Sequence, residues 1–89
     1  LMLITNSEWS YTRAMLGHVI DQFLPDGMTF RQLFDLVIVG ARKPYFFELK
    51  SPAFRIVDED QGLLVPHVGA LQEGGAYFGG NARLVEQCF

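Results

Sequence analysis

The chain has 89 residues, enough for one domain, so residues 1–89 are treated as a single unit. Hydrophobic residues make up 49% of the chain and aromatic residues 13%, which excludes a disordered segment. The net charge is −3 without a basic patch, and no apolar run is long enough for a membrane span. Neither nucleic acid nor a membrane is therefore an expected partner.

The single cysteine, Cys88, excludes an internal disulfide and fits a reducing compartment. The first residues lack the basic flank of a signal peptide. We therefore predict a cytoplasmic protein. Because the sequence starts with Leu1 inside an apolar run, we also expect these residues to come from the interior of a longer chain.

An unbroken apolar run over 1–4 leads directly into Thr5, Asn6 and Ser7. Such a run is typical of a strand that is buried on both faces of a parallel sheet. Ligands of open α/β sheets bind at the carboxyl ends of strands, and helix N-termini favour anions. From these residues two interpretations stay open. The turn either binds a phosphate or carboxylate, or it only ends a strand at Thr5 and caps a helix at Ser7.

Apolar residues at spacings of three and four over 10–23 predict an amphipathic helix. Ser7 or Ser10 is the expected cap, and Pro25 stops the helix. The next signal is the capping-box spacing of a Thr and a Gln at 29 and 32, which predicts a short helix over 30–34.

The apolar run over 36–39 predicts a second buried strand. Strand, helix and strand form a βαβ unit, so the two strands should be parallel with a right-handed crossover. Lys43 should then leave the sheet at the same edge as Thr5. A lysine ammonium beside a threonine hydroxyl suits a phosphate. The alternative, that Arg42 and Lys43 are solvated loop charges, stays open on geometry alone.

Two short β runs, 54–57 and 63–65, flank the acidic stretch 58–60 and predict a β-hairpin. We interpret the acidic stretch as a solvated turn. Gly62 stands where an Asp-x-Asp phosphatase motif needs Thr or Val, and the distal ligands of an EF-hand are missing.

The rest of the chain completes an α/β prediction. The aromatic run 45–47 must either pack on something or be exposed. Residues 76–78 are a short extended stretch, and a short helix follows Asn81. Leu84, Val85 and Cys88 should share one face of that helix. The predicted fold is a partial Rossmann-like core with parallel strands in a βαβ unit plus a β-hairpin.

Several stretches, in this order, resemble the cytosolic purine (IMP/GMP-specific) 5′-nucleotidases of the haloacid dehalogenase superfamily. The resemblance covers nearly the whole chain. It is carried by Leu-Ile-Thr-Asn-Ser at 3–7, Tyr-Thr at 11–12, Phe-Asp-Leu-Val-Ile-Val at 34–39, Ala-Arg-Lys-Pro at 41–44 with Phe-Phe at 46–47, and by Arg55, Val57, Asp58, Gly62, Leu71, Gln72, Gly74, Tyr77, Gly79 and Gly80.

This resemblance implies roles for four residues. Thr5 matches the superfamily's second motif, whose hydroxyl bonds the transferred phosphoryl group, and Asn6 and Ser7 add contacts to the same phosphate. Lys43 matches the third motif, a cation that orients the nucleophilic aspartate and balances the phosphoryl charge. Thr5 and Lys43 are thus the expected catalytic residues. The implied reaction is Mg²⁺-dependent hydrolysis of a purine nucleoside 5′-monophosphate through an aspartyl-phosphate.

The resemblance also implies parts that these residues do not contain. The first motif, Asp-x-Asp-x-Thr, is expected upstream of residue 1, and the acidic metal ligands of the fourth motif are expected beyond Phe89. Gly40 stands where relatives often have an acidic residue. We therefore predict that the 89 residues alone are inactive, and that the first strand self-associates or pairs with the missing parts of its own domain.

Two alternative functions stay open. One is a non-catalytic nucleotide- or phosphate-binding or interaction module of the same fold. The other is a relative that acts on a different phosphate ester. The base preference is not determined by the sequence.

Overall fold

A five-stranded sheet lies at the centre of the molecule, in the order β1-β2-β5-β3-β4. We describe a computed structural model that covers residues 1–25, 27–43, 45–48 and 52–88. β1, β2 and β5 are parallel neighbours, whereas β3 is antiparallel to both β5 and β4. The strands are β1 (Met2–Ile4), β2 (Leu36–Val39), β3 (Ala53–Asp58), β4 (Leu63–Pro66) and β5 (Ala76–Gly79).

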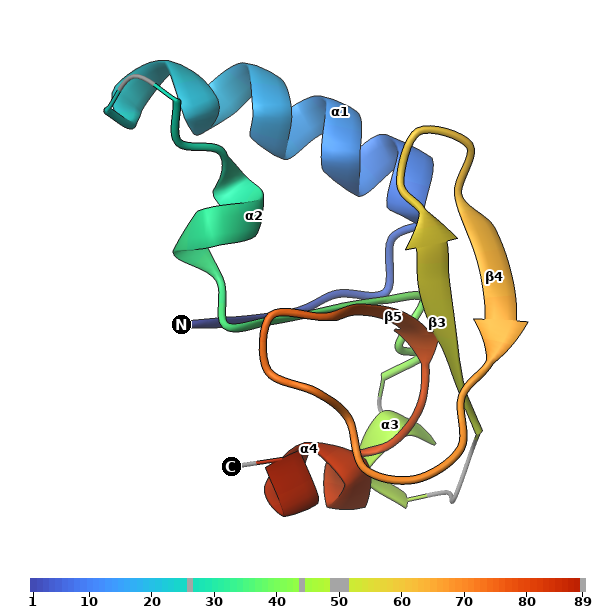
Figure 1. Cartoon of the computed structure of the whole chain (residues 1–89). Coiled ribbons are helices and arrows are strands. Elements are labelled where there is room, and N and C mark those ends of the chain that lie inside the picture. Colours follow the sequence, from blue (N-terminus) through green and yellow to red (C-terminus); the bar gives the residue numbers. More distant parts are fainter. Residues whose placement is uncertain (26, 44, 49–51, 89) are drawn as a thin grey trace.

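Helices cover both faces of this sheet (Figure 1), which confirms the predicted α/β class. Those above the sheet in Figure 1 are α1 (Trp9–Val19), the short 3₁₀ helix η1 (Asp21–Phe23) and α2 (Phe30–Leu33). Those below it are α3 (Tyr45–Glu48) and α4 (Ala82–Cys88). Among the described residues, no helix is long and apolar enough to cross a membrane.

The predicted βαβ unit is confirmed. Leu3 pairs with Val37 and Ile4 with Ile38 in a parallel register, and α1 lies between the two strands in the sequence. All residues of β2 are 0% exposed, as expected for a strand covered by helices on both faces. The hairpin of β3 and β4 is also confirmed, as is the extended stretch at 76–78.

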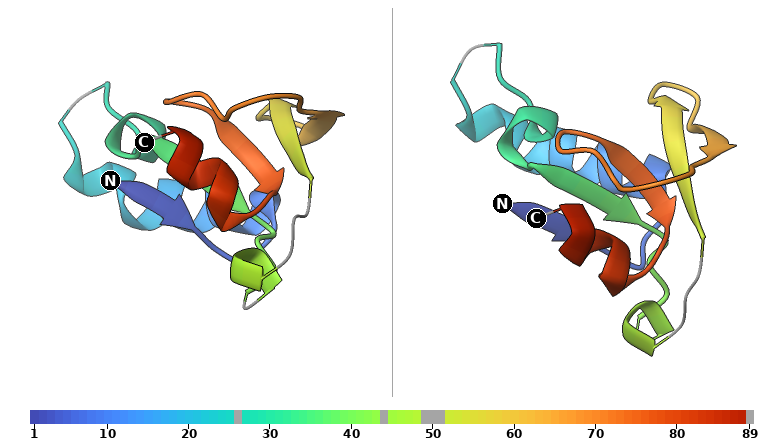
Figure 2. Two further views of the ribbon diagram at one scale, coloured as in Figure 1. Left: turned by 90° about the horizontal axis from the view of Figure 1, so that it is seen from below. Right: turned by 60° about the horizontal axis from the view of Figure 1, so that its bottom comes forward.

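The first strand differs from the prediction of burial on both faces. Leu1 is 72% exposed and Met2 48%, so that prediction is wrong. The reason is position, because β1 is an edge strand with a neighbour only on the β2 side (Figure 2). An edge strand with an apolar sequence offers unpaired backbone groups and uncovered side chains.

The helix α1 starts and ends earlier than the predicted span 10–23. Glu8 is its N-cap residue and makes no side-chain cap hydrogen bond, so the predicted cap by Ser7 or Ser10 is wrong. The helix ends at Val19, because the chain tightens into η1 and then turns toward α2. The Asp21 carboxylate accepts the N–H of Phe30 at 2.7 Å, which fixes this turn.

The short helix α2 confirms the predicted capping box. The Thr29 N–H donates to Gln32 Oε1 at 2.7 Å, and the box is complete. The first residue of α2, Phe30, is buried against Trp9 of α1, with their ring centroids 6.2 Å apart. The capping box therefore places an aromatic side chain between α1 and the sheet.

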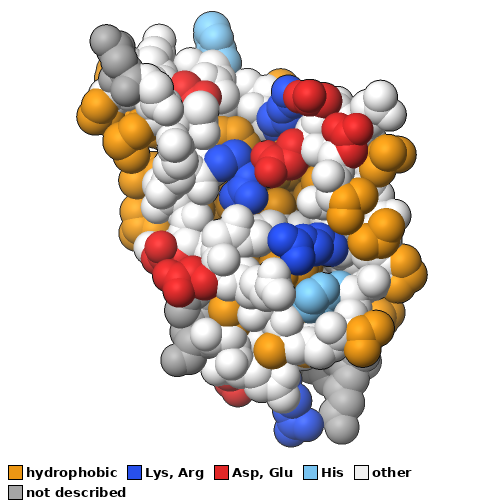
Figure 3. Space-filling model, in the orientation of Figure 1, with side chains coloured by type: hydrophobic (Ala, Val, Ile, Leu, Met, Phe, Trp, Pro, Cys, Tyr) orange, Lys and Arg blue, Asp and Glu red, His pale blue; other side chains and the backbone are white. Residues whose placement is uncertain are grey.

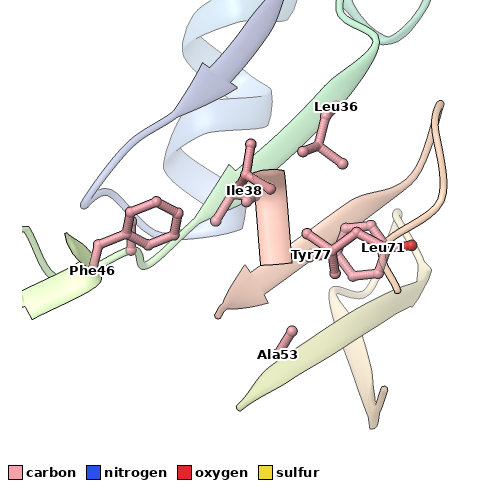
Figure 4. Close-up of a cluster of buried hydrophobic side chains, with 8 residues drawn as sticks. Leu36, Ile38, Phe46, Ala53, Leu71 and Tyr77 are labelled. Carbon is pink, nitrogen blue, oxygen red and sulfur yellow. The ribbon is translucent and has the colours of Figure 1, made fainter. Parts of the chain in front are cut away.

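The core has two parts because alternate residues of β2 point to opposite faces. Figure 4 shows part of the cluster on the α3 and α4 face, which includes Leu36, Ile38, Phe46, Ala53, Leu71 and Tyr77. The cluster on the α1 face holds Trp9, Phe30, Val37, Val39, Ile56 and Ala76. In α4, Val85 is buried and both Leu84 and Cys88 pack on the first cluster, as predicted.

The acidic turn at 58–60 is largely exposed, as interpreted from the sequence, but the helices also bind it, which the sequence did not indicate. Trp9 Nε1 and Arg13 Nη1 both donate to the Glu59 carbonyl, at 2.8 and 3.0 Å. Arg13 also pairs with Asp60 at 2.6 Å, and Arg31 with the Glu59 carboxylate at 2.9 Å. In Figure 3, blue and red side chains lie side by side in the upper part of this face. These contacts fix the hairpin tip above the sheet.

Two adjacent phenylalanines of α3 have opposite environments. Phe46 is 1% exposed, whereas Phe47 is 65% exposed. Replacing Phe46 with Ala should therefore lower the free energy of unfolding of the natural protein by about 3–5 kcal/mol, through lost burial and a cavity. The matched Phe47→Ala should change it by less than about 1 kcal/mol. Urea unfolding followed by fluorescence measures both, and equal losses would contradict this placement of α3.

Candidate phosphate site

The segments that follow β1 and β2 lie side by side at the carboxyl edge of the sheet. The Thr5 N–H donates to the Ile38 carbonyl at 2.9 Å, and the Ala41 N–H donates to the Thr5 carbonyl at 2.9 Å. The Gly40 N–H then donates to the Ser7 carbonyl at 2.8 Å. These bonds continue the parallel pairing past the strand ends. They build an edge of the type at which ligands of α/β sheets bind.

Lys43 lies next to Thr5, as the sequence predicted. Its ammonium, Nζ, donates to the Ile4 carbonyl at 3.1 Å. The carbonyls of Leu1 and Thr5 bond toward the β2 side. Because successive residues of a strand alternate in direction, the Ile4 carbonyl faces the free edge of β1. A further strand paired with the free edge of β1 would therefore end close to the positive charge of Lys43.

The hydroxyl of Thr5 is oriented by its own turn. Thr5 Oγ1 accepts the N–H of Ser7 at 3.1 Å. This contact is the local bond by which Ser and Thr stabilise turns. It uses an oxygen lone pair and leaves the O–H able to donate. Thr5 is only half-buried, so a phosphoryl oxygen can approach it.

Asn6 connects the two segments through its side chain. Its Oδ1 accepts the backbone N–H of Lys43 at 2.7 Å, and its Nδ2 lies 3.5 Å from the Lys43 carbonyl. Sequence reasoning missed this contact, because it joins residues 37 apart and no local pattern signals it. The structure thus brings Thr5, Asn6, Ser7 and Lys43 together, while their proposed contacts with phosphate stay predictions.

Two residues of the second segment have a left-handed backbone. Gly40 has φ of 58° and Arg42 has φ of 60°. At Gly40 a side chain is excluded, since an added Cβ would lie 2.4 Å from Cε2 of the Phe78 ring. A side chain at position 40 would therefore require the ring of Phe78 to move. At Arg42 the left-handed conformation costs roughly 1–3 kcal/mol, which the surrounding bonds must offset.

A groove of about 840 Å³ lies beside the site, between α1 and the hairpin tip. Asn6, Gly40 and Arg42 line it from the sheet edge, and Trp9 and Phe78 form part of its apolar wall. Arg13 and the acidic residues of the hairpin tip line its far side. The groove therefore opens directly next to Asn6 and has both apolar and charged walls.

Within the described ranges, no group of three or more His, Cys, Asp or Glu side chains is placed to hold a metal ion. The groups gathered at the sheet edge are a hydroxyl, an amide and an ammonium. Such groups donate hydrogen bonds to anions. The site thus has the chemistry of an anion site.

Comparison with known proteins decides the family. All of residues 1–89 match the model of the 5′ nucleotidase family. The chain belongs to the 5′ nucleotidase family. Curated relatives include the 5′-nucleotidase domain-containing protein 2 of Homo sapiens and that of Rattus norvegicus. Each is 40% identical over 81 residues, which is 91% of this chain and 14% of the relative.

The family match confirms the predicted resemblance to 5′-nucleotidases, without deciding between members of different specificity. The chain spans only 14% of the length of these two relatives. The preference for IMP and GMP, the haloacid dehalogenase-type chemistry and the Mg²⁺ requirement stay predictions.

Alanine substitutions at Gly40 and Gly27, compared with each other, separate the cost of a left-handed backbone from the cost of the clash with Phe78. Both glycines have positive φ, but a Cβ at Gly27 meets nothing within 4 Å. Gly27→Ala should cost about 1 kcal/mol of unfolding free energy from the left-handed backbone alone. Gly40→Ala should cost about 1–3 kcal/mol more, because the ring of Phe78 must move.

Thermal or urea unfolding of the natural protein measures both glycine variants. Equal losses for Gly40→Ala and Gly27→Ala would show that Phe78 does not pack over position 40. Gly40→Ala combined with Phe78→Ala should lose less than the sum of the two single losses, because the clash is removed.

Proposed function

We propose that this chain forms the phosphate-binding half of a 5′-nucleotidase that hydrolyses purine nucleoside 5′-monophosphates of the IMP and GMP type. One observation carries the proposal. The Lys43 ammonium lies 3.1 Å from the Ile4 carbonyl, one residue before Thr5 at the same strand end. An ammonium and a hydroxyl at one edge provide two donors for phosphoryl oxygens. Membership of the family supports the class of reaction.

In this proposal Thr5 and Lys43 stabilise the phosphoryl group during its transfer. The Thr5 hydroxyl donates to a non-bridging oxygen, and the Lys43 ammonium balances the charge on these oxygens. Asn6 and Ser7 lie close enough in the chain to add contacts. An aspartate outside these residues attacks phosphorus and releases the nucleoside, as in haloacid dehalogenase-type enzymes. Water then hydrolyses the aspartyl-phosphate.

Mg²⁺ is expected in this reaction, but the residues of this site do not fit it as ligands. Mg²⁺ binds oxygen atoms, chiefly carboxylates together with phosphate oxygens and water. An ammonium repels a cation, and the Asn6 Oδ1 already accepts the Lys43 N–H. We therefore place the metal ligands outside this chain and assign no metal-dependent step to its residues.

The same reasoning gives two expectations for the 89 residues alone. They should lack turnover, because the nucleophile is supplied by another part of the protein. They should also self-associate, or bind the rest of their own domain, through the free edge of β1. The proposed compartment is the cytoplasm, where the monophosphate substrate is available.

Substitutions at the two strand ends test the proposed site in the full natural protein. With IMP and Mg²⁺, Thr5→Ala and Lys43→Ala should each lower kcat by roughly 10²–10³-fold, the range for removal of one donor to a transition-state oxyanion. The release of inorganic phosphate is the measurement. Arg83→Ala is the control, because it removes an exposed positive charge of α4 that does not belong to the proposed site. It should cost less than about tenfold.

Two results would count against this function. Turnover that survives both Thr5→Ala and Lys43→Ala would contradict the assignment of the site. Binding of the monophosphate without any turnover by the unmodified full protein would favour the non-catalytic module instead.

A further inference from the structure

The backbone around Lys43 is held in place from one side by Asn6. Gly40 and Ala41 are bound to Ser7 and Thr5 through backbone hydrogen bonds, but both lie before the left-handed Arg42. Among the described contacts between the segments 5–7 and 40–43, only those of Asn6 reach the backbone beyond Arg42. Within the second segment, the Phe46 N–H also donates to the Arg42 carbonyl at 3.3 Å, so Asn6 is the contact that ties the Lys43 backbone to the segment after β1.

We propose that Asn6 is a positioning residue for Lys43. Its Oδ1 fixes the Lys43 N–H at 2.7 Å, and this contact holds the lysine backbone in the place from which Nζ reaches the Ile4 carbonyl. The effect of Asn6 on turnover rests on the proposed function. The effect of Asn6 on the geometry of Lys43 does not.

The physical argument begins with the flexibility of lysine. Lys43 is exposed, and an exposed lysine side chain has about 2 kcal/mol of rotamer entropy that favours free movement in water. Only a well-placed backbone lets such a side chain return repeatedly to one acceptor. A left-handed Arg42 is strained, and the Asn6 contact restrains the residue that follows it. Relaxation at Arg42 would turn Lys43 away from β1.

The amide group of Asn6 is also oriented by this contact. Because the Lys43 N–H is a donor, the oxygen of the Asn6 amide must face it, and the NH₂ group takes the other position. The oxygen is therefore engaged, and only the NH₂ group is able to reach a phosphate. A direct contact and a positioning role make different predictions, so experiments can separate them.

The first experiment measures geometry without any turnover. Amide hydrogen exchange at Lys43, read by NMR or by fragmentation mass spectrometry on the full natural protein, should become several-fold faster in Asn6→Ala. Asn6→Asp keeps Oδ1 and should restore protection. Gln22→Ala is the matched control, because it removes an amide that also bonds a backbone group, the Val19 carbonyl, at the far end of α1. It should leave the exchange at Lys43 unchanged.

The second experiment is a double-mutant cycle of Asn6→Ala and Lys43→Ala, with IMP hydrolysis as the readout. Asn6→Ala alone should lower kcat by up to roughly 10²-fold, with little change in KM, because it misplaces a group that acts in the transition state. In the Lys43→Ala background, the same substitution should have a clearly smaller effect, since only a contact of the Asn6 NH₂ group with phosphate is left to lose.

The outcomes separate this proposal from the proposed function. Unchanged exchange at Lys43 in Asn6→Ala, or the same fold-loss from Asn6→Ala in both backgrounds, would overturn the positioning role. A full protein that lacks nucleotidase activity but shows faster exchange at Lys43 in Asn6→Ala would overturn the proposed function and support the positioning role.

Discussion

The parallel pairing of β1 with β2 is the constraint on which the rest of the site depends. It brings two chain segments that are more than 30 residues apart to one edge in a fixed register, with Ile4 opposite Ile38. The pairing continues beyond the strands through backbone bonds from Gly40 and Ala41. This backbone pairing brings the hydroxyl, amide and ammonium groups to one edge, so their side chains do not need to contact one another directly.

The burial of β2 explains why this pairing is stable. Each residue of β2 is covered on both faces, so a shift of register would exchange the side chains between two different clusters. The α1 face holds Trp9 and Phe30, and the other face holds Phe46 and Tyr77. The place of the site at the sheet edge is therefore set by the core, whereas polar contacts such as that of Asn6 with Lys43 adjust the groups within it.

The hairpin tip adds a second fixed wall beside the site. Cations from α1 and α2 bind its acidic residues, and the Trp9 indole N–H bonds its backbone. Exposed ion pairs contribute little each, but these contacts converge on Glu59 from two helices. In β4, the other strand of the hairpin, Leu63, Leu64 and Val65 are exposed. The groove owes its shape to this hairpin.

The sequence by itself determined the five strands, the helices α1, α2 and α4, and their order, but not the helix α3. The 3.6-residue period over 10–23, the capping box at Thr29 and the two unbroken apolar runs are local signals, which do not depend on a tertiary structure. The approach of Lys43 to Thr5 was also predictable, because parallel strands end at a common edge.

Only the tertiary structure decided the exposure of β1, the burial of Phe46 beside the exposed Phe47, and the attachment of the acidic turn to Arg13. The contact between Asn6 and Lys43 belongs to the same group, since it depends on the left-handed turn at Arg42 and on two distant segments meeting. A pattern in the sequence reports which face of an element is apolar, whereas the identity of the neighbour is fixed only when the sheet has formed.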